Sequence, residues 1–377
     1  MNKNIIIDGV LNAGKTKGII FPIVEEILKR KESFIVSDSK KEYYNYYSEK
    51  ARDNGYNVCV INIENPSNSN SIDIFELPYR YYKEGRKDEA FKLLDILTKS
   101  ICLIDESTDP FWGMSAGSLI LGILVKIMED GKKEELNFKS VYNVLAKFSH
   151  LDNKLLNNYF NTNDGSVIYQ GAASVLSMPP ETRESVIAVA KNLLFDNVIY
   201  EDMVNMLNNA SIKLDDVEDK PLAMFVITSN VNCDRNIIFN MIYSQLDYVF
   251  RNSNNKFNVI LDNFDELKLY NFKQLFVSSN SYDINMILAT RDLSDLTKRY
   301  SDYLFKVADV MHVSDKRIRK TFDGKEEISD LLINDYLIED KDFPELEKKD
   351  IKTFNIYEHV SSELINSIAS KGESVEN

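Results

Sequence analysis

The stretch that most constrains the fold of this chain is Gly9-Val10-Leu11-Asn12-Ala13-Gly14-Lys15-Thr16. It follows the apolar run Asn4–Ile7 and precedes apolar residues at helical spacing between Ile19 and Ile27. A strand, a glycine-containing loop and a helix in this order form a phosphate-binding P-loop. An ordinary turn before an amphipathic helix would explain the glycines, but not Gly-Lys-Thr at the required spacing.

Each residue type in the loop has a chemical reason to be there. Gly9 and Gly14 let backbone N–H groups close around phosphate oxygens, and the helix that starts near Lys15 adds its positive dipole end. Lys15 would reach the terminal phosphates, and the Thr16 hydroxyl would ligate Mg²⁺. We therefore expect the nucleotide to contact Gly9, Asn12, Ala13, Gly14, Lys15 and Thr16.

Composition limits the function classes. The formal net charge of −14 over 377 residues argues against nucleic-acid binding through the overall field, but leaves room for a local basic loop or an oligomeric pore. Cys59, Cys102 and Cys233 have no CxxC spacing and are typical of small core residues in a reducing compartment. The three histidines are scattered, so a histidine metal centre is not indicated.

No membrane segment is predicted. The first strand starts within five residues of Met1, so a signal peptide is not indicated. The longest apolar stretch, Leu119–Met128, is interrupted by Gly122 and Lys126 and is too short to span a bilayer. It predicts a buried helix in a soluble chain.

Short apolar runs alternate with helical patterns, which predicts an α/β fold with a mostly parallel sheet and helices on both faces. Asp38 follows the second strand and Asp262 ends the fifth, so both lie where ligands bind in open α/β sheets. The expected strands are Asn4–Asp8, Ser33–Ser37, Asn57–Ile61, Leu222–Thr228, Asn258–Asp262, Asn285–Thr290 and Val307–Val313.

Between the third and fourth strands the sequence has almost no strand signal. Helical periodicity there predicts an all-helical inserted domain over residues 79–176. Residues 1–78 and 177–377 would form the nucleotide-binding core, the second part ending in an acidic tail. The helical patterns are Asp88–Cys102, Phe111–Asp130, Phe138–Phe148, Asn153–Tyr159 and Glu181–Leu194.

A P-loop ATPase needs a second acid on a distant strand to hold Mg²⁺. Asp262, at the end of an apolar strand, is the predicted metal-side residue, although it would also suit a cap of the following turn. The next residue is Asn263, and an amide cannot act as a base. Asp265 and Glu266 are the alternatives for activating water, and we assign that catalytic role to Glu266 beside Lys15 and Asp262.

Several segments, in order, resemble the TraG-type conjugative coupling proteins, the VirD-like ATPases of type IV secretion systems. Phe34–Tyr43 resembles that family's strand ending in Asp-Pro-Lys-Gly-Glu, and Asn62–Pro66 its Asn-Pro turn. Ser71–Phe75 resembles a degraded Tyr-Asn-Pro-Phe element. Asp109-Pro110-Phe111-Trp112 matches a family tetrapeptide, and Ile242–Leu246 resembles the helix before the second-acid strand.

The resemblance implies a RecA-like core with an inserted helical domain that recognises cargo. It implies a motor that binds ATP and Mg²⁺ and assembles as a hexameric ring. Its partners would be single-stranded DNA or a relaxase–DNA complex and the proteins of a secretion channel. It would act in the cytoplasm at the inner face of the bacterial membrane through partners. Membrane helices precede the P-loop in the family, and two explanations stay open for this sequence: these helices were removed, or the protein is a soluble relative that relies on partners for anchoring.

The chain also departs from the family pattern. Leu261-Asp262-Asn263-Phe264 stands where the family has Leu-Asp-Glu-Phe, and no arginine occurs near Ser281, where the family places one. Arg291 and Arg299 lie near the position of a family glutamine. Two alternatives therefore stay open: a degenerate, non-hydrolysing structural or adaptor subunit, and a P-loop kinase or metabolic enzyme. The chain has no compact acceptor-site motif for the latter.

Overall fold

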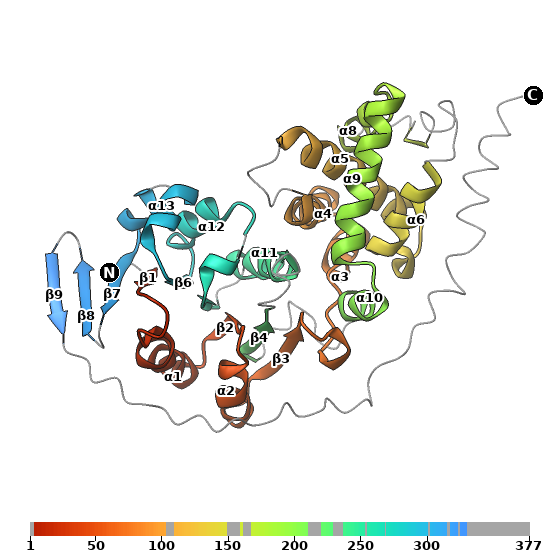
Figure 1. The fold of residues 1–377 in the computed structure, drawn as a ribbon. Coiled ribbons are helices and arrows are strands. Elements are labelled where there is room, and N and C mark those ends of the chain that lie inside the picture. The colour runs from red at the N-terminus through yellow and green to blue at the C-terminus, as the bar shows by residue number, and fades with distance from the viewer. Residues whose placement is uncertain are drawn as a thin grey trace, which may run out of the picture. The chain divides into compact units, whose positions relative to one another are not determined.

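The computed structural model describes residues 4–102, 109–148, 159–160, 167–209, 220–228, 237–252, 255–267, 269–300, 302–314, 317–322 and 325–329. The chain divides into two compact units (Figure 1). The sheet unit combines the segment up to Asn70 with the segment that begins at Ile212. The helical unit is Ser71–Ser211.

The sheet unit is built on seven parallel strands in the order β3-β4-β2-β5-β6-β1-β7. The predicted mostly parallel α/β sheet is confirmed, and each strand lies within two residues of its expected bounds. The strands are β1 Ile5–Asp8, β2 Ser33–Ser37, β3 Asn57–Asn62, β4 Leu222–Ile227, β5 Phe257–Leu261, β6 Ile284–Thr290 and β7 Asp309–Ser314.

Two further strands extend this sheet beyond β7. β8 (Arg317–Phe322) pairs antiparallel with β7, and β9 (Lys325–Ser329) pairs antiparallel with β8. The sequence did not predict this hairpin, because its charged residues hide the apolar alternation by which strands are recognised. Such charge suits the edge of a sheet, where it discourages pairing with another chain.

Helices cover both faces of the sheet. α1 (Phe21–Arg30) and α2 (Glu42–Asp53) lie on one side, and α11 (Ile237–Arg251), α12 (Phe272–Ser279) and α13 (Leu293–Tyr300) lie on the other (Figure 1). Phe34 and Val36 of β2 belong to the core cluster formed with α1 and α2, while Ile35 points to the opposite face and is equally buried. Burial on both faces explains why the strands read as continuous apolar runs.

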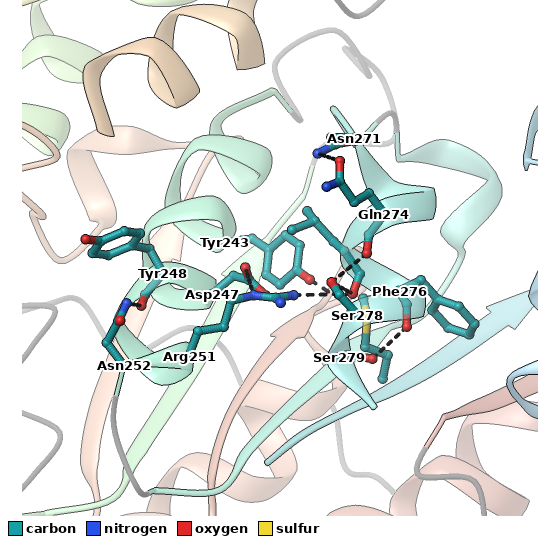
Figure 2. Close-up of polar contacts among 12 residues, drawn as sticks. Tyr243, Asp247, Tyr248, Arg251, Asn252, Asn271, Gln274, Phe276, Ser278 and Ser279 are labelled. Atoms are coloured by element: carbon teal, nitrogen blue, oxygen red, sulfur yellow. Dashed lines mark hydrogen bonds and ion pairs between the residues drawn. The ribbon is translucent and has the colours of Figure 1, made fainter. Parts of the chain in front are cut away.

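Polar groups of α11 contact both α12 and β6. Arg251 pairs with Asp247 one turn earlier and donates to the carbonyl oxygen of Leu275 at 3.4 Å, and Tyr243 points its hydroxyl at Met286 Sδ at 3.8 Å (Figure 2). Burial raises the pKa of Asp247, and the Arg251 guanidinium opposes that effect. An almost wholly buried helix is thus fixed to its neighbour by directional contacts as well as by apolar packing.

The helical unit contains the long helix α5 (Pro110–Asp130), which packs against α4, α6, α8 and α9. Asp109 caps α5 by accepting the Phe111 amide at 3.0 Å, and Pro110 follows at the first helical position, where a missing N–H costs nothing. The family tetrapeptide is therefore a helix start. The other helices are α3 Glu76–Lys83, α4 Lys87–Cys102, α6 Phe138–Phe148, α8 Val167–Leu176, α9 Pro180–Asn197 and α10 Glu201–Asn208.

Among the described residues α5 is the one helix long and apolar enough to cross a membrane, by length and composition only. Its most apolar 18-residue window is 61% buried inside the protein, as a core helix would be. The helical unit is wider than the predicted insertion of 79–176, because α9 packs against α5 and α6. The predicted helix Asn153–Tyr159 lies, apart from its last residue, outside the described residues, and so does Cys233.

Candidate functional site

The loop between β1 and the first helix has the backbone that a P-loop needs. Gly9 is buried against β7, and a Cβ atom there would lie 2.6 Å from the carbonyl oxygen of Val313. Asn12 and Gly14 adopt left-handed backbone angles, with φ of 63° and 94°. Glycine and asparagine tolerate this region best, so the loop conformation follows from residue types that the sequence places there.

The helix after the loop opens with an irregular turn. Thr16–Ile20 is π-helical and leads directly into α1. Pro22 has no amide hydrogen and cannot donate to the carbonyl of Gly18, so a regular α-helical ladder is impossible at this point. The Gly18 amide donates to the Gly14 carbonyl at 2.8 Å, which holds the start of the helix under the loop. The first backbone N–H groups of a helix have no acceptor within the helix, so the start of this helix stabilises an anion bound at the loop.

Lys15 is folded back into the loop. Its side chain is buried, and its ammonium donates to the carbonyl oxygens of Gly9 and, at 3.1 Å, of Val10. Burial lowers the pKa of Lys15, and the carboxylates of Asp262, Asp265 and Asp8 oppose that effect. Among the described residues, the hydrogen-bond partners of the ammonium are these two carbonyl oxygens, which phosphate oxygens can replace.

Asp262 converges on the P-loop from the end of β5. Its Oδ2 accepts the Thr16 hydroxyl at 2.7 Å and the Tyr43 hydroxyl at 2.9 Å, and its Oδ1 accepts the Asn263 amide at 2.9 Å. Thr16 and Asp262 are 246 residues apart in sequence, yet their oxygens share a hydrogen bond. A hydroxyl and a carboxylate at this separation are hard oxygen donors of the kind that Mg²⁺ prefers, so the pair fits the metal.

The floor of the site is made at the end of β2. Ser37 donates to the carbonyl oxygen of Asp262 at 2.9 Å, and Asp38, which is 1% exposed, accepts the Tyr44 amide at 2.8 Å. Burial raises the pKa of Asp38 to about 7. Asp38 thus fixes the start of α2 and, through it, the position of Tyr43. Tyr43 lies within the family-like segment Phe34–Tyr43, but no role for it is visible in the sequence, because its contact with Asp262 depends on β2 lying beside β5.

Asn263, Asp265 and Glu266, which follow Asp262, each contact a different part of the sheet unit. Asn263 has a left-handed φ of 55° and donates its side-chain amide to the Ser39 hydroxyl at 2.9 Å. Asp265 accepts the Thr290 hydroxyl at 2.6 Å and the Arg291 amide at 2.8 Å, so both of its carboxylate oxygens are used. Glu266 forms an ion pair with Arg291. The structure thus brings Lys15, Thr16 and Asp262 together and places Glu266 on the adjoining edge.

This geometry defines a P-loop fold with a second acid opposite the loop. Comparisons with known proteins identify the family. The family model described as type IV secretory system conjugative DNA transfer matches residues 5–306. The chain belongs to this family. No sequence among the curated proteins matches the chain.

Solved structures show the same fold at low identity. The bacterial conjugative coupling protein TrwB, lacking 70 N-terminal residues, has a TM-score of 0.59 at 11% identity, over 82% of this chain and 68% of its own. TrwB with the ATP analogue ADPNP gives the same TM-score and identity, over 82% and 70%. VirB4 of Thermoanaerobacter pseudethanolicus has a TM-score of 0.53 at 12% identity, over 83% and 78%. The RecA-like fold implied by the resemblance is confirmed.

Proposed function

We propose that this protein is an ATP-driven motor of conjugative DNA transfer, which couples ATP hydrolysis to delivery of DNA or a relaxase–DNA complex to a type IV secretion channel. The observation that carries the proposal is the contact of the P-loop Thr16 with the strand-end Asp262 beside the buried Lys15. Family membership supplies the transfer pathway. TrwB, which shares the fold, has been crystallised with ADP and Mg²⁺, which supports the same ligands here.

Each residue has a role in this proposal. Lys15 leaves the carbonyls of Gly9 and Val10 to contact the terminal phosphates, while the loop amides and the helix start hold the phosphate oxygens. Thr16 and Asp262 would hold Mg²⁺, and Tyr43 orients the Asp262 carboxylate through its hydroxyl hydrogen bond. Bound Mg²⁺ would neutralise charge on the β- and γ-phosphates. Glu266 is the candidate base, because Asp265 already uses both carboxylate oxygens to bind the end of β6.

Assembly and partners follow from the family. We propose a hexameric ring at the inner face of the membrane, in which a neighbouring subunit completes the nucleotide site. An arginine supplied in trans is worth ~10³–10⁵ in rate, so monomers would turn over slowly. The acidic chain would contact single-stranded DNA through local pore loops rather than its whole surface. The helical unit would contact cargo.

Steady-state ATP turnover of the intact chain, with and without single-stranded DNA, tests this function. We expect Lys15→Ala to lower turnover by about 100-fold or more, as removal of one charge-stabilising group does. Lys17→Ala is the matched control, because Lys17 lies two residues on, outside the loop, and should leave turnover unchanged. Turnover that survives Lys15→Ala would refute the assignment of this site.

A second function is favoured by one observation. Asn263 replaces the family glutamate after the second acid, and its amide is committed to Ser39. A non-hydrolysing relative that binds nucleotide as a structural or adaptor subunit would show tight binding of ATP and Mg²⁺ with no turnover at any protein concentration. That result, in place of turnover sensitive to Lys15→Ala, would select the adaptor.

A further inference from the structure

The end of β6 lies between the two halves of the nucleotide site. In the sheet, β6 stands between the P-loop strand β1 and the acid strand β5. The Gly9 amide donates to the Thr290 carbonyl at 3.3 Å, so the first residue of the P-loop is bonded to the residue before Arg291. The backbone of residue 291 therefore lies next to a residue that is hydrogen-bonded to the P-loop.

Asp265 fixes this strand end rigidly. Its two carboxylate oxygens accept the Thr290 hydroxyl at 2.6 Å and the Arg291 amide at 2.8 Å. The peptide between Thr290 and Arg291 is thus held on both sides, its carbonyl oxygen by Gly9 and its N–H by Asp265.

The Arg291 side chain is held by an exchangeable partner. Its guanidinium pairs with the Glu266 carboxylate, and the two side chains are 44% and 24% exposed. An ion pair this open to water contributes about 0–1 kcal/mol. The planar guanidinium fork matches a phosphate group better than a single ammonium does, and a phosphate carries more charge than a carboxylate.

Arg291 also lies close enough to the P-loop to affect it. Gly9 accepts the Lys15 ammonium at its carbonyl oxygen and donates its amide to the Thr290 carbonyl at 3.3 Å, so Arg291 follows a residue that is bonded to the loop holding Lys15. Two cations held near each other repel, and a polyphosphate between them removes that repulsion.

We propose that Arg291 is a phosphate-contacting residue of this site, which exchanges Glu266 for the terminal phosphate when a nucleoside triphosphate binds. The exchange releases the Glu266 carboxylate next to the phosphate, where a base is needed. This inference rests on the proposed function for the presence of nucleotide. It adds a contact, in the same chain, that distinguishes triphosphate from diphosphate.

The test is equilibrium binding of ADPNP and of ADP, each with Mg²⁺, to the intact chain and its variants. We expect Arg291→Ala to weaken ADPNP binding by about tenfold to a hundredfold, the range for one hydrogen-bonded charge, with ADP affinity unchanged within about twofold. Arg299→Ala is the matched control. Arg299 lies on the same edge and donates to the Asp265 carbonyl at 3.3 Å, so its removal should alter neither affinity selectively.

Glu266→Gln tests whether Arg291 exchanges the Glu266 carboxylate for the phosphate or only lies near the phosphate. It removes the competing carboxylate and should strengthen ADPNP binding while leaving ADP binding unchanged, and it should have no such effect in the Arg291→Ala background. Equal weakening of both nucleotides by Arg291→Ala, or no weakening, would overturn this inference while leaving the nucleotide site intact. A wild-type chain that binds neither nucleotide would overturn the proposed function itself.

Discussion

Asp38→Asn should change how the stability of the sheet unit depends on pH. Asp38 is fully buried at the end of β2, and that burial raises its pKa from the ordinary 3.8 to about 7. In the unfolded chain the carboxyl ionises near its ordinary value. Between these two values the folded protein holds a proton that the unfolded chain has lost, so rising pH favours unfolding. Asparagine keeps an oxygen to accept the Tyr44 amide but carries no charge.

The magnitude follows from the pKa shift. Each pH unit inside the window costs the wild-type protein about 1.36 kcal/mol relative to the uncharged variant. Folding of the wild type becomes less favourable from about pH 4, and the loss levels off above about pH 7. Between pH 5 and pH 8 the stability difference between Asp38→Asn and wild type should therefore widen by about 2.7 kcal/mol, in favour of the variant.

Hydrogen exchange read by mass spectrometry on peptides from β2 and α2 measures this locally. Trp112 lies in the helical unit, so tryptophan fluorescence would not report on β2. The ratio of the two exchange rates at the same pH is independent of the intrinsic exchange rate and of the effects of titrating groups that both proteins share. We expect the ratio of their exchange rates to change about 100-fold across the range. A ratio independent of pH would refute the argument that Asp38 is protonated in the folded protein.

Glycine replacements test the packing that shapes the site and the helical unit. Gly9→Ala should abolish nucleotide binding in a titration with ADPNP, because its Cβ would lie 2.6 Å from the Val313 carbonyl; wild-type affinity would contradict the loop geometry. Gly122→Ala should destabilise the helical unit by about 1–3 kcal/mol, because its Cβ would lie 2.5 Å from that of Ala172. Gly117→Ala, on the same helix with its nearest neighbour at 3.6 Å, should instead stabilise it by about 0.4–1 kcal/mol. Unfolding followed by the fluorescence of Trp112 distinguishes these outcomes, and effects of the same sign would contradict the predicted packing at α5.

Local patterns were sufficient to predict much of this fold. The P-loop, the seven parallel strands and helices α4, α5, α6 and α9 depend on residues within a few positions of one another, and apolar spacing and glycine placement make them visible in the sequence. The same holds for Asp262, because an acid after an apolar strand is visible in the sequence. Helices α3, α8 and α10 were not predicted. The β8–β9 hairpin was not predicted, because charged residues at the sheet edge interrupt the apolar alternation by which a strand is recognised in a sequence.

The partners of the predicted site residues were decided only by the tertiary structure. The contacts of Tyr43 with Asp262, of Asp265 with Thr290 and of Glu266 with Arg291 all depend on strand order, with β2 beside β5 and β6 inserted between β5 and β1. Strand order is set by packing of whole helices and strands across the core, and no short stretch of sequence encodes it. Sequence therefore determined which groups reach the carboxyl edge of the sheet, and the fold decided which of them meet.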